Sequence, residues 1–595
     1  MKIISKIYSI LTYENKKNSI IFFSLLVLAT IFEVLSISLI FPAITILINS
    51  ELPDNLQFIS YGLDYLSDIT GQNDIVVGLS ILILVFFLKN TFLLYYFWWK
   101  NGYSNEVQKQ LSQRLLLTYL RQPYSFHLQR NSSDLIRNLV SEVSTFQKTF
   151  QSGLELVFEI IVLISILILI FIVEPKAALI VFSIIVAISY IIYKLTSRAI
   201  KYWGKTRLSE SSKYFKNVSQ AIGSVRDIIL TGRENNFLFA HFNQKSILVK
   251  IQQKFGTITV LPRFLFEFLA VFGILLITII FISEGRSYEK IIPSISLFAM
   301  AGYRLMPSIN RILVSAQGFR YRFMTIDILY DELMGDNSER KKIENNFVKP
   351  SKVSIDQSQK YENLFKDQIK ITGLCYNYKN TSIKTLNNIN LNIKKGQSLG
   401  IFGPSGSGKS TLISLILGLL EPTRGKIEID GVDLRKKIIP WQRNIGYVPQ
   451  SVYLIDDTIS QNIAFGISPD QIDIKKIEKA IEAAQLKKFI DTLNDKTDTI
   501  VGENGVRLSG GQIQRIGIAR ALYHNPSVVV FDEATSSLDY EIEKELMKDI
   551  NMLKSDKTLI MIAHRLTTVE NCDFVIKLKS GKIIDQGKPE KVLRS

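Results

Sequence analysis

The stretch Gly403–Thr411 reads GPSGSGKST and directly follows the apolar run SLGIF. Its spacing fits the pattern G-x-x-x-x-G-K-[ST], in which a strand leads into a phosphate-binding loop and then into a helix. Gly403, Gly406 and Gly408 let backbone N–H groups converge on phosphate oxygens where side chains would block them. The helix that begins near Lys409 adds the positive end of its dipole to this anion site. The stretch therefore predicts an α/β nucleotide-binding domain.

Side chains in this loop have the chemistry that a nucleoside triphosphate requires. The Lys409 ammonium is expected to reach the β- and γ-phosphates, and the Ser410 hydroxyl is expected to bind Mg²⁺. Ser405 and Thr411, in the same stretch, are further predicted contacts of the nucleotide. ATP and Mg²⁺ are therefore the expected cofactors.

A second apolar run, SVVVFDE at Ser527–Glu533, ends in two carboxylates. Asp532 is placed to hold the Mg²⁺ shell, and Glu533 is placed to polarise the attacking water. The alternative is a buried strand that ends in acids at a turn. The phosphate loop upstream favours the catalytic interpretation.

The pentapeptide LSGGQ at 508–512 lies between these two motifs and resembles the signature of ATP-binding cassette (ABC) proteins. The resemblance implies that Ser509, Gly510, Gly511 and Gln512 contact the nucleotide. In this family each ATP lies between the phosphate loop of one cassette and the signature of another, and this chain has one of each. Two chains are therefore implied. Because none of the motifs is degenerate, a homodimer with two active sites is the simplest expectation.

Other family elements follow in the same order along the chain. Gln450 in IGYVPQ resembles the loop glutamine that contacts Mg²⁺ and the membrane domain, and His564 in TLIMIAH resembles the switch histidine that touches the γ-phosphate. The tetrapeptide SSLD resembles the loop that joins two cassettes, which implies a role for Asp539. Tyr378 in LCYNYK is similar to the aromatic residue that stacks on adenine. The last of these is the least specific, because a strand tyrosine is usually a packing residue.

Apolar runs of bilayer-spanning length occupy the first 320 residues, whereas the last 230 contain none. Six such runs approach or exceed the ~20 residues that cross the hydrocarbon layer. They lie at 19–48, 75–99, 154–173, 177–193, 258–282 and 291–316. The predicted fold class is a multi-domain membrane protein, with an all-α six-helix transmembrane exporter domain and an α/β P-loop ATP-binding cassette. The predicted domains are 1–335 for the membrane part, 336–366 for a linker and 367–595 for the cassette.

The net charge of +17 could suggest a nucleic-acid partner, but the placement of the charges argues against one. Residues 49–74, between the first two runs, hold five acids and no Lys or Arg, whereas 194–257 is rich in both. This asymmetry is the positive-inside pattern of membrane proteins. Both termini and the cassette are therefore expected in the cytosol. Cys375 and Cys572, the two cysteines, fit a reducing compartment.

Charged residues inside the predicted spans are costly and are functional candidates by default. Lys89, Arg263 and Arg304 are the proposed substrate contacts. One interpretation is pairing or hydration, because Arg263 and Glu267 are four residues apart on one helix. The other is a cationic cavity for an anionic headgroup. A short stretch at 52–66 is either an amphipathic helix on the outer surface or a solvated loop.

Several membrane segments favour the cationic cavity. VLPRFLFEF around Arg263, AGYRLMPSINRI around Arg304 and FEVLSISLIFPAI around Glu33 resemble the lipid-linked-oligosaccharide flippases of bacterial protein N-glycosylation, the PglK type. The resemblance implies a polyprenyl diphosphate that carries a glycan, with basic residues bound to the diphosphate. It also implies that the chain lies in a bacterial cytoplasmic (inner) membrane. Segments 121–139 and 232–242 resemble the family's intracellular loops with coupling helices.

Three other kinds of ATP-hydrolysing cassette protein are alternatives. A general exporter of lipids or drugs shares every cassette motif but usually needs a more apolar cavity. A cassette protein of DNA repair or translation also hydrolyses ATP, and six spans of the right length argue against it. A peptide exporter with its own cysteine protease is disfavoured because no cysteine precedes Cys375.

Overall fold

The computed structural model describes residues 3–39, 42, 65–69, 71, 73–173, 175–283, 288–335, 365–378, 384–533, 557–563 and 566–593. These residues separate into two compact units. The first is helical and holds the chain up to the expected linker, except that residues 123–128 group with the second unit. The second unit holds the two β-sheets that follow the linker. Each unit is described by itself below.

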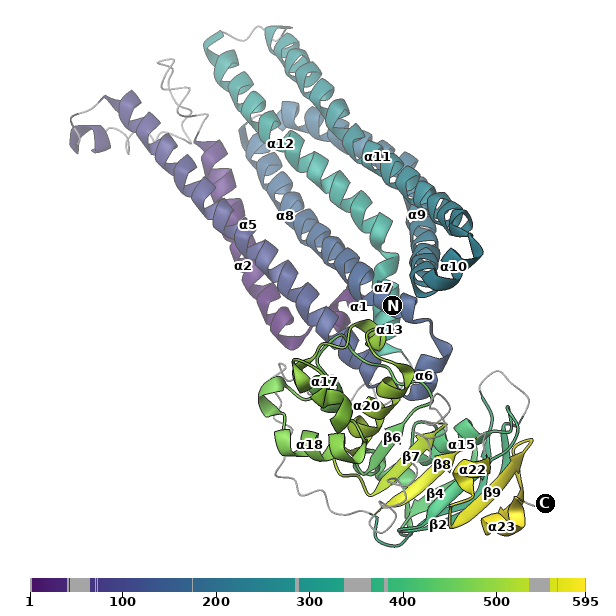
Figure 1. The fold of residues 1–595 in the computed structure, drawn as a ribbon. Coiled ribbons are helices and arrows are strands. Elements are labelled where there is room, and N and C mark those ends of the chain that lie inside the picture. The colour runs from purple at the N-terminus through teal and green to yellow at the C-terminus, as the bar shows by residue number, and fades with distance from the viewer. Residues whose placement is uncertain are drawn as a thin grey trace. The chain divides into compact units, whose positions relative to one another are not determined.

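Long helices dominate the first unit (Figure 1). They are α2 (Tyr13–Ser38), α5 (Asp74–Leu120), α8 (Val143–Val173), α9 (Pro175–Gly223), α11 (Glu234–Ser283) and α12 (Tyr288–Arg322). Shorter helices are α1 (Ile3–Ile10), α7 (Ser132–Arg137), α10 (Val225–Thr231) and α13 (Met324–Met334), with a π-helical turn at Asn138–Glu142. The short helix α6 (Tyr124–Gln129) falls almost entirely within the residues that group with the second unit. Figure 1 shows α12 beside α8 and α11 beside α9, and these pairs are in contact.

Among the described residues, four helices are long and apolar enough to cross a membrane. They cover Tyr13–Ser38, Ile75–Leu120, Ser132–Ile172 and Glu234–Ser283. The other two expected spans, 177–193 and 291–316, lie inside the helices α9 and α12, whose side chains are described only in part. The helical membrane part expected from the sequence is confirmed.

A core of aromatic and aliphatic side chains holds the long helices together. Phe22 and Leu26 of α2, Tyr96 of α5 and Phe158 of α8 are almost fully buried in it. The rings of Tyr96 and Phe158 stack with their centroids 5.0 Å apart. Since α11 contains Pro262, one backbone hydrogen bond of that helix cannot form.

The second unit contains a mixed sheet that carries the phosphate loop. Its strand order is β10-β9-β3-β8-β7-β6. The strands β9, β3, β8, β7 and β6 run parallel to one another, and β10 is antiparallel to β9. The strands are β3 (Ser398–Phe402), β6 (Ile445–Val448), β7 (Val528–Asp532), β8 (Thr558–Ile562), β9 (Phe574–Lys579) and β10 (Lys582–Gly587). Because parallel sheets are covered on both faces, β7 and β8 are buried at every residue.

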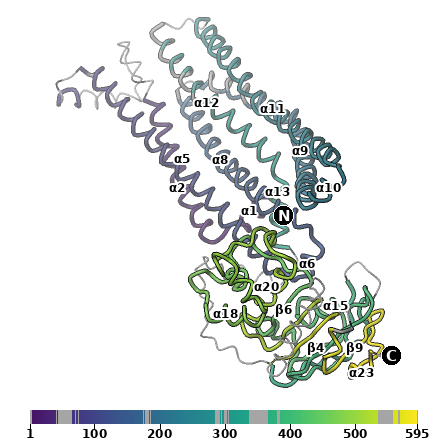
Figure 2. The backbone as a smooth tube through the Cα atoms, viewed as in Figure 1, coloured from purple at the N-terminus to yellow at the C-terminus, as the bar shows by residue number. Residues whose placement is uncertain are grey.

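A smaller antiparallel sheet has the order β2-β1-β4-β5. Its strands are β1 (Gln368–Tyr376), β2 (Leu386–Lys394), β4 (Arg424–Ile429) and β5 (Val432–Asp433). The helices of this unit are α15 (Lys409–Ile416), α16 (Ile438–Arg443), α17 (Ile459–Ile463), α18 (Ile474–Ala483), α19 (Lys487–Asp491), α20 (Gly510–Leu522), α22 (Leu566–Val569) and α23 (Pro589–Val592). The backbone tube in Figure 2 ends with α23 beside β9.

The predicted linker, 336–366, lies outside the described residues except for its last two positions. Phe365 is fully buried in the core of the second unit and meets Trp441 edge-on, with ring centroids 5.9 Å apart. The Lys366 backbone N–H donates to Asp430. These two residues therefore pack as part of the second unit. The predicted surface stretch at 52–66 is described only at Tyr65 and Leu66, so it lies almost wholly outside the described residues.

Candidate functional site

The phosphate loop connects β3 to α15, as the sequence predicts. Gly408 has a φ of 103° immediately before the helix, a backbone conformation that side chains rarely adopt. Gly403 has a φ of 155°, and a Cβ atom there would lie 2.1 Å from the carbonyl oxygen of Leu578. Both positions therefore require glycine, and the loop can turn sharply enough for its N–H groups to face an anion.

The Lys409 side chain folds back over this loop. Its residue is 5% exposed, and Nζ donates to the carbonyl oxygens of Gly403 at 2.8 Å and Pro404 at 3.2 Å. Burial lowers the pKa of the Lys409 ammonium, although Glu533 and Asp532 oppose this shift. An ammonium has three donors, so a phosphate oxygen can still be bound while both carbonyl contacts persist.

Ser407 is a loop residue that sequence reasoning did not single out. Its Oγ is buried and has no hydrogen-bond partner in the described chain. A buried hydroxyl without a partner is costly, and a phosphate oxygen held by the loop would satisfy it. The position is a variable one in the motif, so the sequence carries no signal for it. Together with Lys409 and the two glycines, it makes a site that fits the phosphates of ATP.

The strand β7 ends at Asp532, and Glu533 follows with a φ of 53°. Positive φ is strained for a residue with a side chain, and such strain is often found at functional sites. The Gln450 Nε2 donates to Glu533 Oε2 at 2.8 Å. The structure thus brings two of the predicted catalytic residues into direct contact.

Asp532 has a partner that the sequence did not reveal. The Tyr447 hydroxyl donates to Asp532 Oδ2 at 3.1 Å from the neighbouring strand β6. Burial raises the pKa of the Asp532 carboxyl, and this hydrogen bond opposes that effect. A carboxylate held in place beside a phosphate loop is a suitable Mg²⁺ ligand. Tyr447 lies three residues before Gln450, and its role follows only from the parallel pairing of β6 with β7.

Tyr378 lies beside the helix that follows the loop. Its hydroxyl oxygen is 3.1 Å from Thr411 Oγ1, and its ring meets that of Tyr376 edge-on at 5.0 Å. The contact places Tyr378 near the phosphate-binding helix. Its stacking on adenine stays a prediction.

The signature residues cap the helix α20. Ser509 is the N-cap: its Oγ accepts from the Gln512 backbone N–H at 3.3 Å, and its own N–H donates to Gln512 Oε1 at 2.8 Å. Gly510 and Gly511 form the first turn. This reciprocal cap orients the N–H groups of the first turn, where the helix dipole favours an anion.

The Ser410 hydroxyl and Ser405 are described without a contact that tests their predicted roles.

His564 and Asp539 lie outside the described residues, as does the whole SSLD segment. The backbone of Arg304 belongs to α12, but its side chain is not among the described ones. The predicted roles of these three residues therefore stay predictions.

Two of the proposed substrate contacts form ion pairs. Lys89 Nζ lies 3.8 Å from Glu33 Oε2, and the two side chains are 11% and 4% exposed. Arg263 Nε donates to Glu267 Oε1 at 2.8 Å, and both side chains are largely exposed. The i,i+4 pair agrees with the pairing interpretation of the sequence, whereas the Lys89–Glu33 pair joins different helices.

Comparison with known proteins finds two families along the chain. The family described as "ABC transporter transmembrane region" matches residues 19–302, and the family described as "ABC transporter" matches residues 386–536. Together the two matches account for more than half of the chain.

Individual relatives fall into two groups. An ATP-dependent lipid A-core flippase of Ralstonia nicotianae is 26% identical over 495 residues, which are 82% of this chain and 80% of the relative. An alpha-hemolysin translocation ATP-binding protein of Proteus vulgaris is 45% identical over 226 residues, which are 38% of this chain. That alignment spans about a third (32%) of the length of the relative.

The fold is that of a solved exporter structure. A bacterial Atm1-family ABC exporter with ATP bound superimposes with a TM-score of 0.72 at 21% sequence identity, over 96% of both chains. At this identity the likeness establishes the fold alone.

Proposed function

Because this chain belongs to the ABC transporters and joins their transmembrane region to their ATPase domain, we propose that it is a flippase for a polyprenyl diphosphate carrying an oligosaccharide. Its ATPase domain is coupled to transport, and it is an integral membrane protein of the exporter type. The nature of the cargo is the part that we propose.

The likeness to a lipid A-core flippase carries this proposal. The alignment covers 82% of the chain, so it must include most of the helical unit. The alignment with the hemolysin translocation protein covers only 38%. The helical unit is the part that would contact a transported molecule, so similarity there is informative about the cargo. The flippase is named for a lipid. The narrower assignment to a lipid-linked oligosaccharide rests on the resemblance of the segments around Glu33, Arg263 and Arg304.

The proposed ATPase chemistry follows from the site. Lys409 and the loop N–H groups bind the phosphates, and the signature of a second chain, from Ser509 onward, completes the site. Mg²⁺, when bound by Ser410, Gln450 and Asp532, neutralises charge on the phosphates. Glu533, held by Gln450, orients and polarises the attacking water.

Assembly and location are part of the proposal. One phosphate loop and one signature per chain favour a homodimer with two composite sites. ATP binding would close the two cassettes on each other, and hydrolysis would release them. The charge asymmetry of the loops favours a cytosolic position for both termini and the cassette. The resemblance to bacterial glycolipid flippases favours a bacterial cytoplasmic membrane.

The ion pairs change how the cargo would be bound. Arg263 is exposed, so a diphosphate can replace Glu267 as its partner. Lys89 is buried with Glu33, and a diphosphate would have to compete with that carboxylate. We therefore propose Arg263 as the stronger phosphate ligand of the two, with Arg304 as the third member of the set.

Reconstitution in liposomes tests the cargo. The purified protein is expected to move a polyprenyl-diphosphate glycan across the bilayer when ATP is supplied. The Arg263→Gln variant should lose most of this transport, by about tenfold or more, because a charge-assisted hydrogen bond to phosphate is lost. Basal ATPase activity should be retained, since Arg263 lies outside the nucleotide unit.

Glu267→Gln is the matched control. If Arg263 serves only to pair with Glu267, both substitutions will lower transport equally. If Arg263 binds phosphate, Glu267→Gln will leave transport intact. Full transport by Arg263→Gln, or uptake of a neutral drug in place of the glycolipid, would contradict the proposed cargo and favour a general lipid or drug exporter.

A further inference from the structure

A cavity of about 370 Å³ opens in the helical unit between α1, α8, α9 and α12. Its lining consists of Ile3, Leu156, Tyr193, Lys201, Ala316, Phe319, Arg320 and Phe323. The volume lies at the lower end of the range for small-molecule sites. None of the residues assigned above to ATP or to the transported lipid belongs to this lining.

Positive charge is the polar feature of this cavity. Arg320 donates through Nη1 to the Tyr193 hydroxyl at 2.7 Å and through Nε to the Ser197 carbonyl at 3.1 Å. Neither bond uses Nη2, so the guanidinium is held in a fixed orientation with donors to spare. Lys201 has no hydrogen bond or ion pair within the described chain, and the described lining contains no carboxylate.

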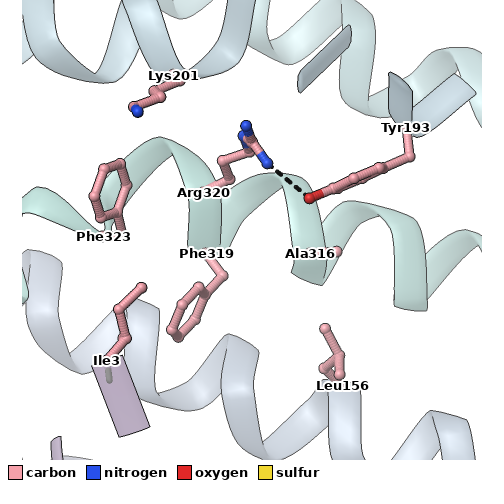
Figure 3. A pocket seen from close by; sticks show the side chains of 8 residues that line it. All are labelled: Ile3, Leu156, Tyr193, Lys201, Ala316, Phe319, Arg320 and Phe323. Atoms are coloured by element: carbon pink, nitrogen blue, oxygen red, sulfur yellow. Dashed lines mark hydrogen bonds between the residues drawn. The ribbon is translucent and has the colours of Figure 1, made fainter. Parts of the chain in front are cut away.

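Apolar side chains make up the remainder. Figure 3 shows Lys201, Arg320 and Tyr193 on one side of the view, and Phe319, Ile3 and Leu156 on the other. A ligand that suits both parts has an anionic group attached to hydrocarbon. A free anion would leave the aromatic and aliphatic surface exposed to water, which is unfavourable.

The position of the cavity along the chain indicates where such a ligand comes from. Leu156 lies near the start of the expected span 154–173, whereas Tyr193 and Ala316 are the last residues of the spans 177–193 and 291–316. Because consecutive spans alternate in direction, these three ends lie on one side of the membrane, the side where Lys and Arg are concentrated.

The two cations lie beyond the hydrocarbon edge. Arg320 is four residues past Ala316, which is about 6 Å along a helix, and Lys201 is eight residues past Tyr193, or about 12 Å. These distances correspond to the headgroup layer rather than to the middle of the bilayer. Basic pockets between membrane helices at this level bind anionic headgroups.

We propose that this cavity is a binding site for an anionic phospholipid of the surrounding membrane. The lipid phosphate contacts Lys201 and Arg320, and the adjoining hydrocarbon packs on Phe319, Phe323 and Leu156. Since Ile3 also lines the cavity, a bound lipid would fix the N-terminal helix α1 against α8 and α12. The site stands whether or not the transported cargo is a polyprenyl diphosphate.

Native mass spectrometry of the full-length, delipidated protein tests the site. Phosphatidylglycerol is added, with phosphatidylcholine of the same acyl chains as the zwitterionic comparison and inorganic phosphate as the anion without hydrocarbon. The wild type should bind phosphatidylglycerol most tightly. Replacing both Lys201 and Arg320 with Gln should weaken its binding by about 30-fold, from the loss of two cations near the surface.

Single substitutions separate binding from folding. Arg320→Gln also breaks the bonds to Tyr193 and Ser197, whereas Lys201 is exposed and holds nothing in place. Lys201→Gln alone should therefore weaken binding by about fivefold in a normally folded protein. Arg198→Gln removes an equal charge from the same helix outside the lining and should have no effect.

The proposal would be overturned by equal binding of the two phospholipids by the wild type, by unchanged affinity in Lys201→Gln, or by an equal loss in Arg198→Gln. Tight binding of inorganic phosphate alone would also contradict it, because the apolar lining would then contribute nothing.

Discussion

Glu533 combines a strained backbone with a hydrogen bond from the Gln450 side chain. A residue at the end of a buried strand normally relaxes to an extended or helical conformation, yet Glu533 has a φ of 53° and accepts a hydrogen bond from Gln450. Strain of this kind persists when surrounding contacts hold it. Here it directs the Glu533 carboxylate beside Asp532, at the end of β7.

The Glu533→Gln variant should bind ATP with unchanged affinity and lose its turnover. Glutamine keeps the shape and can still bond to Gln450, but it cannot accept a proton from water, so kcat should fall by about 10² to 10⁴. Phosphate release measures turnover, and equilibrium binding of ATP measures affinity. In the control variant Lys409→Ala, the loss should appear in ATP binding. Undiminished ATPase activity in Glu533→Gln would show that another group activates the water.

The sequence predicts these residues unequally. The motif spacing selects Lys409, Asp532 and Glu533 because their chemistry depends on neighbours in the chain. Tyr447 and Ser407 were missed, since one acts through the pairing of β6 with β7 and the other through burial of its hydroxyl. The i,i+4 spacing indicates the pair Arg263–Glu267, which is one of the two interpretations of the sequence. Lys89–Glu33 joins α5 to α2, and no local pattern in the sequence indicates it.

Asp430 fixes the start of the antiparallel sheet. It follows β4, and its carboxylate accepts from the backbone N–H groups of Lys366, Asp367 and Gln368 at 2.6, 2.9 and 2.8 Å. Burial by itself raises the pKa of Asp430, but the three N–H donors and Lys395 outweigh it, so the pKa lies below its usual value. The carboxylate therefore stabilises the fold in its charged form.

Asp430→Ala should loosen the first residues of β1. We expect the free energy of opening there to fall by about 2 kcal/mol near pH 7. A lowered folded-state pKa gives stability that is present above the unfolded value of about 3.9 and is lost as pH falls through the folded value. The difference between variant and wild type should thus shrink below about pH 4.

Hydrogen exchange of the peptide that contains β1, corrected for intrinsic rates at each pH, measures this effect. Asp470→Ala, at an exposed acid of the same unit, is the control and should leave β1 unchanged. Equal protection of β1 in Asp430→Ala at neutral pH would mean that the three N–H groups find water as an adequate partner.

Among the helices and strands, the pattern of apolar residues predicts β3, β7 and the long helices, because buried strands and membrane helices are continuous apolar runs. The packing at the end of the predicted linker could not be predicted from the sequence. Phe365 packs on Trp441, which is 76 residues further along the chain. The sequence before Phe365 is polar and also holds Phe347 and Tyr361, so no local pattern marks Phe365 as a packing residue.

The whole protein is proposed to work as a pair of identical chains with composite ATP sites. This can be tested by mixing two inactive variants, Lys409→Ala and Ser509→Arg. Each alone should be inactive, because both of its sites contain a damaged half. A mixed dimer has one site with two intact halves. Random mixing should then restore about a quarter of the wild-type ATPase rate if the two sites act independently.

The same experiment distinguishes composite sites from sites that are complete within one chain. Two variants whose sites are self-contained would stay inactive on mixing, and that outcome would contradict the composite site. Co-expression with two different affinity tags allows the mixed dimer to be purified, so that its activity is measured without the inactive forms.

Helix length has a mechanical consequence for the whole molecule. The 49 residues of α9 measure about 74 Å, more than twice the ~30 Å hydrocarbon layer. A rigid rod of this length is a lever, and a tilt of only 5° about one end carries the other through about 6 Å. Proline is absent from α9 after its first residue, whereas α11 contains Pro262 directly before Arg263. A displacement of one end of α9 is therefore transmitted to its other end without a proline kink. In contrast, α11 can bend at Pro262, next to the exposed Arg263.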